Sequence, residues 1–572
     1  MKMLKKYLKE YKWYIVVGPF FKLLGTILEL CNPIIVAKIV DVGVKNNDID
    51  YIIKLGIIIL IVNIVGFLFN LISQKCASLT STGVSTSLRK DLFKKISEFS
   101  HTELDKFGTA SLVNRIMNDV YQVENAVGLS LRLLIRIPFL LLGAFVISLI
   151  INPMMSIVFL VLIPVVCLIL WIYTKKTSPY YKMMREKLDT VGKITQENLK
   201  GTRVIRAFNK QEDEEKRFNI ASADYTKTSI KISKISALLS PLMLLFVNIV
   251  TIAILMLGGW QVNLGNMQQG EILALIDYVT MITLSLLIMS QLIIMIVRTN
   301  ASLNRIKEVF SVIPSIQDKP DALETKKLKY DAIMEFKDVS FNYANDKETP
   351  SFIKDLSFSI YPHQTIGIIG GTGSGKTTIA NLMARFYDAT RGEILFKGVN
   401  VKDISLKCLR EDLSIVQQRS SLFKGSIREN MQLRDKDATD EEINEALKIS
   451  QAYDFVSKWK DGLDHQILAG GKNISGGQLQ RLTIARAIIN KPDMLILDDS
   501  NSALDFLTDS KLRKALKKLD TTLVLISQRA TSVQNADLII VLDNGNVVGM
   551  GKHQELLKNC EVYLEIYRSQ TR

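Results

Sequence analysis

Cysteine and histidine are scarce in this sequence. Among 572 residues there are four histidines and five cysteines, and the cysteines are scattered, at Cys31, Cys76, Cys167, Cys408 and Cys560. An odd and dispersed set argues against a disulfide-stapled secreted domain, and none of the spacings matches a metal site. We therefore expect buried, reduced thiols.

The sequence also lacks the charge placement of a nucleic-acid-binding protein, although its formal net charge is +15. Lysine and arginine gather between long apolar runs, where a membrane protein carries them. Charged residues make up 23% of the chain, yet its mean hydropathy is +0.18, so the apolar residues must be concentrated in one region. They lie in about the first 300 residues, and a chain of this length needs at least two domains. We expect no nucleic-acid partner.

No small-residue cleavage site follows the basic, amphipathic stretch MKMLKKYLKEYKWY at the N-terminus. We therefore expect a helix on the cytoplasmic membrane surface rather than a signal peptide. Six apolar runs follow, each about 20 residues or longer, which is the length that spans a bilayer. The predicted spans are 13–40, 51–73, 129–151, 154–173, 241–260 and 272–297.

Basic residues are nearly absent from every second connection between these spans. The turn at 152–153 and the loop at 261–270 contain no lysine or arginine, and 41–50 contains only Lys45. The N-terminal stretch and the two long connections are basic and therefore cytoplasmic, as is the chain after the sixth span. The long connections are polar with helical periodicity, so we predict helices that project well below the membrane. Their tips, near 104–112 and 201–208, can touch a soluble domain; the alternative is a solvated hairpin without a partner.

A polar linker with two prolines, at 311–330, separates the two halves of the chain. We predict an all-α transmembrane domain of six helices with long cytoplasmic helical extensions at 1–310. A soluble α/β domain is predicted at 331–572.

A glycine-rich loop in the soluble half lies between a strand-like and a helix-like segment. Residues 370–377 match G-x-x-x-x-G-K-[ST], the phosphate loop of P-loop NTPases. The glycines let backbone N–H groups wrap the phosphates of ATP, Lys376 reaches the β- and γ-phosphates, and Thr377 offers its hydroxyl to Mg²⁺. The predicted ATP-binding residues of this loop are Gly370, Gly371, Thr372, Gly373, Ser374, Gly375, Lys376, Thr377 and Thr378.

Two further segments suit the same chemistry. The apolar run MLILD ends in Asp498, a carboxylate that can hold Mg²⁺ through water. The run ISGGQ opens a helix whose exposed N–H groups can also meet phosphate. Its predicted ATP-contacting residues are Ser475, Gly476, Gly477 and Gln478.

With these three motifs in this order, the chain resembles the ATP-binding-cassette (ABC) family over essentially its whole length, including the exporter-type transmembrane half. The resemblance implies two cassettes paired head to tail, with each ATP between the phosphate loop of one and the Ser-Gly-Gly-Gln of the other. It implies that Tyr343 stacks on adenine and that Gln418 senses Mg²⁺ together with Thr377 and Asp498. It also places Asp505 in the loop that communicates between the two sites.

Two residues that this family uses for hydrolysis are missing. Asp499 stands where the family has a glutamate that polarises the attacking water, and its carboxylate is one methylene shorter. Gln528 replaces the switch histidine; it can hydrogen-bond the γ-phosphate but cannot become cationic. We predict that the set Asp499, Gln528 and Gln418 binds ATP and hydrolyses it poorly. No histidine replaces the missing one by a shifted register, because the four lie elsewhere, at His101, His363, His465 and His553.

This pattern resembles the degenerate-site subunit of bacterial heterodimeric multidrug exporters. The implied partner is a second ABC half-transporter that carries the glutamate and the histidine, and the ISGGQ segment would act on that partner's ATP. We expect a multi-pass protein of the cell (plasma) membrane, in contact with lipid, with its N-terminus and ABC domain in the cytoplasm. It would export hydrophobic or amphipathic small molecules. The alternatives are an exporter of lipid or peptide, a homodimer with two slow sites, and a non-transporting regulator that senses ATP.

Few charges interrupt the predicted spans. Lys22 and Glu29 are seven residues apart on one helical face, so we expect them to pair with each other or to face a cavity. Asp277 in the sixth span leads to the hypothesis that the transported molecules are cationic amphiphiles.

Overall fold

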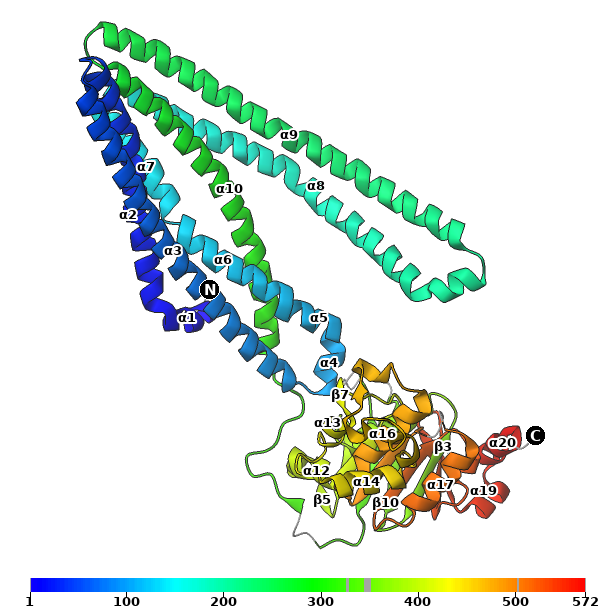
Figure 1. Ribbon diagram of the computed structural model, residues 1–572. Helices are drawn as coiled ribbons and strands as arrows, with labels where there is room; N and C mark the ends of the chain where they lie inside the picture. The colour runs from blue at the N-terminus through cyan, green and yellow to red at the C-terminus, as the bar shows by residue number, and fades with distance from the viewer. Residues whose placement is uncertain (1, 326–328, 344–350, 501–503, 571–572) are drawn as a thin grey trace. The chain divides into compact units, whose positions relative to one another are not determined.

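The computed structural model in Figure 1 describes residues 2–325, 329–343, 351–500 and 504–570. The chain divides into two compact units. Unit 1 comprises Met1–Ser97 and Ala110–Val312, and unit 2 comprises Glu98–Thr109 and Ile313–Arg572. The predicted domain boundaries put 98–109 with the transmembrane half, whereas the structure groups this short stretch with the α/β half.

Unit 1 is built from helices, and among the residues that the structure describes six helical segments are long and apolar enough to cross a membrane. They are Met3–Val44, Ile49–Ser97, Thr109–Ile151, Pro153–Ala207, Gln211–Asn263 and Gln269–Ser311. The six predicted spans are thereby confirmed. Several of these helices run far beyond the roughly 20 residues that a bilayer requires, which confirms the predicted helical extensions. Figure 1 shows two of the longest, α8 (Pro153–Ala207) and α9 (Gln211–Asn263), packed side by side.

The turn between the third and fourth spans follows directly from its sequence. Asn152 ends one span and caps the next, because its Oδ1 accepts hydrogen bonds from the backbone N–H groups of Met154 (2.9 Å) and Met155 (3.2 Å). Pro153 occupies the first turn of α8, where its missing N–H costs nothing. The other helices are α1 (Lys2–Leu8), α2 (Lys12–Lys38), α3 (Ile49–Ser97), α5 (Thr109–Asn114), α6 (Val120–Leu133), α7 (Arg136–Ile151) and α10 (Gln269–Ser311), with π-helical turns at Ile39–Val44 and Arg115–Asp119.

The charged residues of the spans pair differently from expectation. Glu29 of α2 accepts two hydrogen bonds from Arg136 of α7, at 2.7 Å and 3.0 Å. Lys22 instead donates to Asn70 of α3 at 2.5 Å. The expected pairing of Lys22 with Glu29 is therefore wrong, because both residues find partners on neighbouring helices that spacing along one helix cannot reveal.

Unit 2 is centred on a six-stranded sheet, which confirms the predicted α/β class. The strand order is β12-β11-β3-β10-β9-β6, and all neighbours except the β11–β12 pair run parallel. Its strands are β3 (Thr365–Gly370), β6 (Leu413–Val416), β9 (Met494–Asp498), β10 (Thr522–Ser527), β11 (Leu538–Asp543) and β12 (Asn546–Gly551). A second, antiparallel sheet of order β2-β1-β4-β5 consists of β1 (Met334–Phe341), β2 (Ile353–Ile360), β4 (Arg391–Phe396) and β5 (Val399–Asn400), and a small ribbon pairs β7 (Gly425–Ser426) with β8 (Gln466–Ile467).

Two hydrophobic cores cover the two faces of the parallel sheet. Along β9, Met494 and Ile496 belong to the core beneath the antiparallel sheet, while Leu495 and Leu497 belong to the core beneath the helices. This alternation follows from the two-residue period of a strand, and it explains why the central strands are apolar throughout. The helices of unit 2 are α4 (His101–Phe107), α11 (Lys376–Met383), α12 (Leu406–Asp412), α13 (Ile427–Met431), α14 (Asp440–Ile449), α15 (Tyr453–Val456), α16 (Gly476–Ile488), α17 (Phe506–Leu516), α18 (Ala530–Val533), α19 (His553–Asn559) and α20 (Glu561–Gln570).

Candidate functional site

Four parallel strands of unit 2 deliver the candidate residues to one edge of the sheet. The loops that follow β3, β6, β9 and β10 all leave from carboxyl ends, and in open α/β sheets ligands bind at that edge. A pocket of about 200 Å³ lies there. Its lining residues are Phe352, Thr372, Gly373, Gly375, Lys376, Thr377, Thr378, Gln418, Asp498, Asp499 and Gln528. Segments more than 150 residues apart along the chain thus meet where the sequence predicted an ATP site.

The glycine-rich loop has the backbone that a phosphate cradle requires. Gly373 and Gly375 have φ of +82° and +102°, a region that favours glycine. A side chain at Gly370 would bring its Cβ within 2.3 Å of the carbonyl oxygen of Leu542, so the close approach of the loop to β11 also requires glycine. Helix α11 then begins at Lys376, which turns its N-terminus toward the loop.

Lys376 is the buried cation of this pocket. Its Nζ donates to the carbonyl oxygens of Gly370 (2.9 Å) and Gly371 (2.6 Å), so the ammonium group is held inside the loop. Burial lowers the pKa of Lys376, and the carboxylates of Asp499 and Asp498 oppose that shift. A buried cation beside exposed backbone donors suits the charge of a nucleotide phosphate.

The oxygen ligands expected for Mg²⁺ lie beside this lysine. Asp498 ends β9 and is buried, and it is hydrogen-bonded to the side chain of Thr377. Burial and neighbouring Asp499 raise the pKa of Asp498, whereas the Thr377 bond and the Lys376 charge lower it. Gln418 lines the same pocket, so a hydroxyl, a carboxylate and an amide side chain come together there. Mg²⁺ prefers oxygen ligands of this kind, so these residues fit the ion, which would neutralise phosphate charge there.

The two residues that depart from the family pattern line the same pocket. The Oδ2 atom of Asp499 accepts a long hydrogen bond, 3.4 Å, from Nε2 of Gln418. Its backbone has φ of +45°, which an aspartate tolerates better than most residues, and its N–H donates to the carbonyl oxygen of Ile526 at 2.8 Å. Gln528 lies in the loop after β10, with an exposed side chain. No histidine is among the described residues that line the pocket.

The predicted adenine-stacking residue lies at the edge of the pocket. The hydroxyl of Tyr343 is 2.8 Å from Oγ1 of Thr378, and its ring packs edge-on against Phe341 with centroids 4.8 Å apart. Phe352, which precedes β2, lines the pocket itself, whereas Tyr343 does not. Sequence reasoning did not single out Phe352, because the motif signal was confined to segments with polar or glycine-rich chemistry.

The ISGGQ segment lies outside this pocket. Ser475 caps α16, with its hydroxyl accepting from the N–H of Gln478 (3.3 Å) while Oε1 of Gln478 accepts from the N–H of Ser475 (2.9 Å). This capping box leaves Ser475 and Gly476 exposed at the start of the helix. None of the four predicted residues 475–478 is among the lining residues of the pocket. Asp505 caps α17 in a similar way, accepting from Thr508 at 3.0 Å, and it too lies outside the lining.

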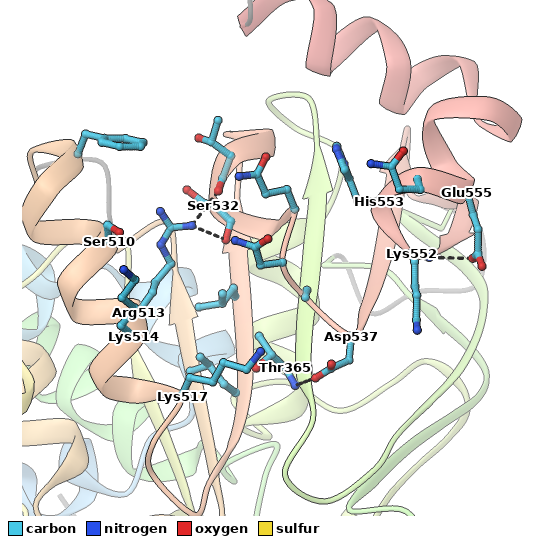
Figure 2. Close-up of a pocket in the computed structure, with 18 residues that line it drawn as sticks. Thr365, Ser510, Arg513, Lys514, Lys517, Ser532, Asp537, Lys552, His553 and Glu555 are labelled. Atoms are coloured by element: carbon cyan, nitrogen blue, oxygen red, sulfur yellow. Dashed lines mark hydrogen bonds between the residues drawn. The ribbon is translucent and has the colours of Figure 1, made fainter.

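A larger cavity, of about 770 Å³, lies at another place on unit 2 (Figure 2). Thr365 and Leu523, at the amino ends of β3 and β10, contribute to its lining, so it opens at the edge opposite the predicted site. Figure 2 shows Arg513 reaching from α17 to the segment that contains Ser532, and its Nη1 donates to the carbonyl oxygens of Thr531 (2.7 Å) and Ser532 (3.1 Å). No predicted site residue lines this cavity.

The short helix α4 lies in unit 2, packed against a pair of aromatic residues. The ring of His101 stacks on that of Phe386, with centroids 4.4 Å apart, and the hydroxyl of Tyr387 donates to Asp105 at 2.7 Å. The first predicted tip, near 104–112, therefore touches the soluble domain, as expected. The second tip, near 201–208, belongs to unit 1, and its contact stays a prediction.

The His101 stack is expected to make this contact sensitive to pH. Burial lowers the pKa of His101 from its ordinary 6.5, Asp105 opposes that shift, and Arg410 adds to it. The contribution of a neutral, stacked histidine is then complete above pH 6.5 and is lost as the pH falls toward the lowered value. Hydrogen-exchange protection of α4, corrected for intrinsic rates, should fall between about pH 7.5 and about pH 5.5.

The variant His101→Phe is the matched control for that experiment, because it keeps an aromatic ring and removes the titrating group. Its α4 protection should stay constant over the same pH range. Equal pH dependence in the variant and the natural protein would show that His101 does not control the contact.

The comparisons with known proteins agree with this geometry. The family model described as the ABC transporter transmembrane region matches residues 15–287, and the one described as ABC transporter matches residues 353–502. The uncharacterized ABC transporter ATP-binding protein YfiB of Bacillus subtilis (strain 168) is 33% identical over 565 residues, which cover 99% of this chain and 97% of YfiB. YfiC of the same organism is 28% identical over 570 residues, covering 99% of this chain and 93% of YfiC.

A solved structure shares the whole architecture. The structure of a bacterial Atm1-family ABC exporter with ATP bound has a TM-score of 0.82 at 22% identity, covering 98% of this chain and 99% of that one. At this identity the likeness shows the fold, in both the membrane helices and the α/β unit. The chain belongs to the ABC transporter family: it is a half-transporter with the exporter fold, a multi-pass membrane protein with a cytoplasmic ABC domain.

Proposed function

We propose that this chain is the degenerate-site subunit of a heterodimeric ATP-driven exporter. In this proposal its own pocket binds ATP with Mg²⁺ and hydrolyses it slowly, through Asp499, Gln528 and Gln418. The second half-transporter supplies a hydrolytic pocket with the usual glutamate and histidine. The exported molecules are amphipathic, as in multidrug exporters, and the negative charge of Asp277 favours cationic ones.

The observation that carries the proposal is that one pocket has residues suited to binding phosphate but lacks the family's residues for activating water. Lys376 is held inside the loop by two backbone carbonyls, and Gly373 and Gly375 have positive φ, which supports binding of phosphate. The positions that should activate water hold Asp499 and Gln528 in the same pocket. An aspartate places its carboxylate about one methylene further from a bound water than a glutamate does, and a general base must lie within about 2.6–3.2 Å of its proton. Binding is thus favoured over turnover.

The exposed ISGGQ segment supports a role for this chain in the ATP site of the proposed partner. Ser475 and Gly476 are exposed at the start of α16 and lie outside the chain's own pocket. A helix N-terminus with free N–H groups suits a phosphate that another chain presents. Since this segment is complete, the chain is better suited to completing a working site than to sensing ATP alone, which disfavours the non-transporting regulator.

Reconstitution of the chain with and without a partner tests the proposal. Purified alone in nanodiscs, the chain is expected to bind ATP and to hydrolyse it at least about tenfold more slowly than its complex with a glutamate-bearing half-transporter. Replacing the partner's catalytic glutamate by glutamine should remove most of the complex's ATPase activity and its drug efflux. Rapid ATP hydrolysis by this chain alone would contradict the proposal and favour a homodimer.

A further inference from the structure

The loop that carries Gln528 is bound at two backbone positions by a side chain from α20, and Oγ of Ser527 also accepts from the N–H of Arg529 at 3.0 Å. Gln570, the last residue of α20, donates from Nε2 to the carbonyl oxygen of Gln528 at 2.8 Å. Its Oε1 accepts from the backbone N–H of Ala530, also at 2.8 Å. One amide thus binds the backbone on both sides of Arg529.

This pair of bonds repeats the pattern of a parallel β-ladder. In such a ladder one residue donates to the carbonyl before its partner and accepts from the N–H after it. The side-chain amide of Gln570 makes the same two bonds on either side of Arg529, so it pairs with the loop backbone as a neighbouring strand residue would. Two bonds in this arrangement fix both the position of the loop backbone and its orientation.

The helix that presents Gln570 is firmly seated. Tyr563 is fully buried, and its hydroxyl lies 2.7 Å from Nδ1 of His553. Ile566 and Tyr567 pack against the core beneath the helices. Residues 563, 566, 567 and 570 follow the spacing of one helical face, so Gln570 lies at the end of the face that packs on unit 2, although its own side chain is exposed.

The segment after the loop is also held in place. The Gln570 amide therefore mainly affects the position of Gln528. Ala530 and Val533 of α18 are fully buried, and Arg513 binds the carbonyl oxygens of Thr531 and Ser532 (Figure 2). Helix α20 itself packs against α18, β3 and β11. The side chain of Gln528, in contrast, is exposed and faces the pocket.

We propose that Gln570 is a positioning residue: by binding the backbone around Gln528, it orients the Gln528 side chain toward the γ-phosphate of ATP in this chain's own pocket. The inference rests on the proposed function in one respect, namely that Gln528 contacts the γ-phosphate. ADP lacks that phosphate, so loss of the Gln570 contact weakens ATP binding and leaves ADP binding unchanged.

The test is the ratio of ADP and ATP dissociation constants, measured with Mg²⁺ for the full chain in nanodiscs. Gln528→Ala is expected to weaken ATP binding about tenfold, the size of one hydrogen bond to a charged group. Gln570→Ala is expected to weaken it about three- to fivefold. In both variants ADP binding should change less than about twofold. If Gln570 acts through Gln528, the double variant should bind ATP as Gln528→Ala does, with no further loss.

Two further variants separate positioning from general damage. Gln570→Glu has the same size and can still accept from Ala530, but it cannot donate to the carbonyl of Gln528, so its effect should be as large as that of Gln570→Ala. Gln554→Ala makes the same truncation at an exposed glutamine of α19, and it should leave both dissociation constants unchanged. Since Gln570 is exposed, its truncation should also leave the thermal unfolding midpoint nearly unchanged.

Each other outcome overturns the inference in a distinct way. If Gln528→Ala lowers the preference for ATP and Gln570→Ala does not, the positioning role is wrong while the proposed function stands. If Gln570→Ala weakens ATP and ADP equally, its role is only structural. If Gln528→Ala has no effect on the ratio, the γ-phosphate contact in the proposed function is wrong, and the role of Gln570 fails with it.

Discussion

Ser475→Asp in this chain is expected to lower the ATPase activity of the complex with the proposed partner by about 10²–10³-fold, which is typical of losing one donor to a developing negative charge. Ser475 is exposed at the N-terminus of α16. In the proposed head-to-tail dimer, the N–H groups of this helix face the γ-phosphate in the partner's pocket. A carboxylate placed there repels that phosphate and competes for the same N–H groups.

The substitution is chosen because it keeps the helix intact. Aspartate caps a helix about as well as serine, so α16 should not lose stability, whereas Ser475→Ala would cost about 1 kcal/mol. Thr439→Asp is the matched control, since Thr439 caps α14 by the same capping box and is also exposed. This control should keep its ATPase activity within about twofold of the natural complex.

The Ser475→Asp experiment also shows which of the two ATP pockets the substitution affects. ATP binding by this chain alone should be unaffected by Ser475→Asp, because Ser475 is not among the lining residues of its own pocket. Undiminished ATPase activity of the complex would contradict a role for this segment in the partner's site. Loss of ATP binding by the isolated chain would instead place Ser475 in its own pocket.

The parts of the structure that sequence reasoning reached are those with a strong local signal. The six spans follow from apolar runs and from the placement of lysine and arginine, and the helices confirm them. The loop from Gly370 to Thr377 follows from residue types that only a phosphate cradle needs together. Parallel strands then bring Asp498, Asp499 and Gln528 to the same edge, because the loops that carry them all leave from carboxyl ends.

The contacts that sequence reasoning missed join residues far apart along the chain. Arg136 begins α7 within the third span, yet it pairs with Glu29, 107 positions earlier. Gln570 binds the loop around Gln528 from 42 positions away, and an exposed glutamine near the end of a helix carries no motif. Phe352 lines the pocket only because β2 brings it there. Each of these contacts depends on packing between elements, which no local spacing encodes.

The double variant Asp499→Glu with Gln528→His is expected to convert this chain's own pocket into a hydrolytic one, raising its ATPase rate by about 10²-fold or more. Glutamate extends the carboxylate by one methylene toward the attacking water. Histidine restores a side chain that can carry positive charge beside the γ-phosphate. Each single change should give a smaller gain than the pair, because both act on the same reacting groups.

The increase in ATPase rate has to be measured in a complex whose other pocket cannot hydrolyse ATP. With the partner's catalytic glutamate replaced by glutamine, the remaining ATPase activity reports on the pocket lined by Asp499 and Gln528. Asp499 has φ of +45°, which aspartate tolerates better than glutamate, so the thermal midpoint and the ATP dissociation constant of the double variant are measured alongside. If both are unchanged and the rate does not rise, the proposed role of these two residues in slowing hydrolysis is wrong. A rise in the ATPase rate without recovery of drug efflux would show that transport depends on which of the two pockets hydrolyses ATP. The asymmetry between the two subunits would then be part of the transport mechanism.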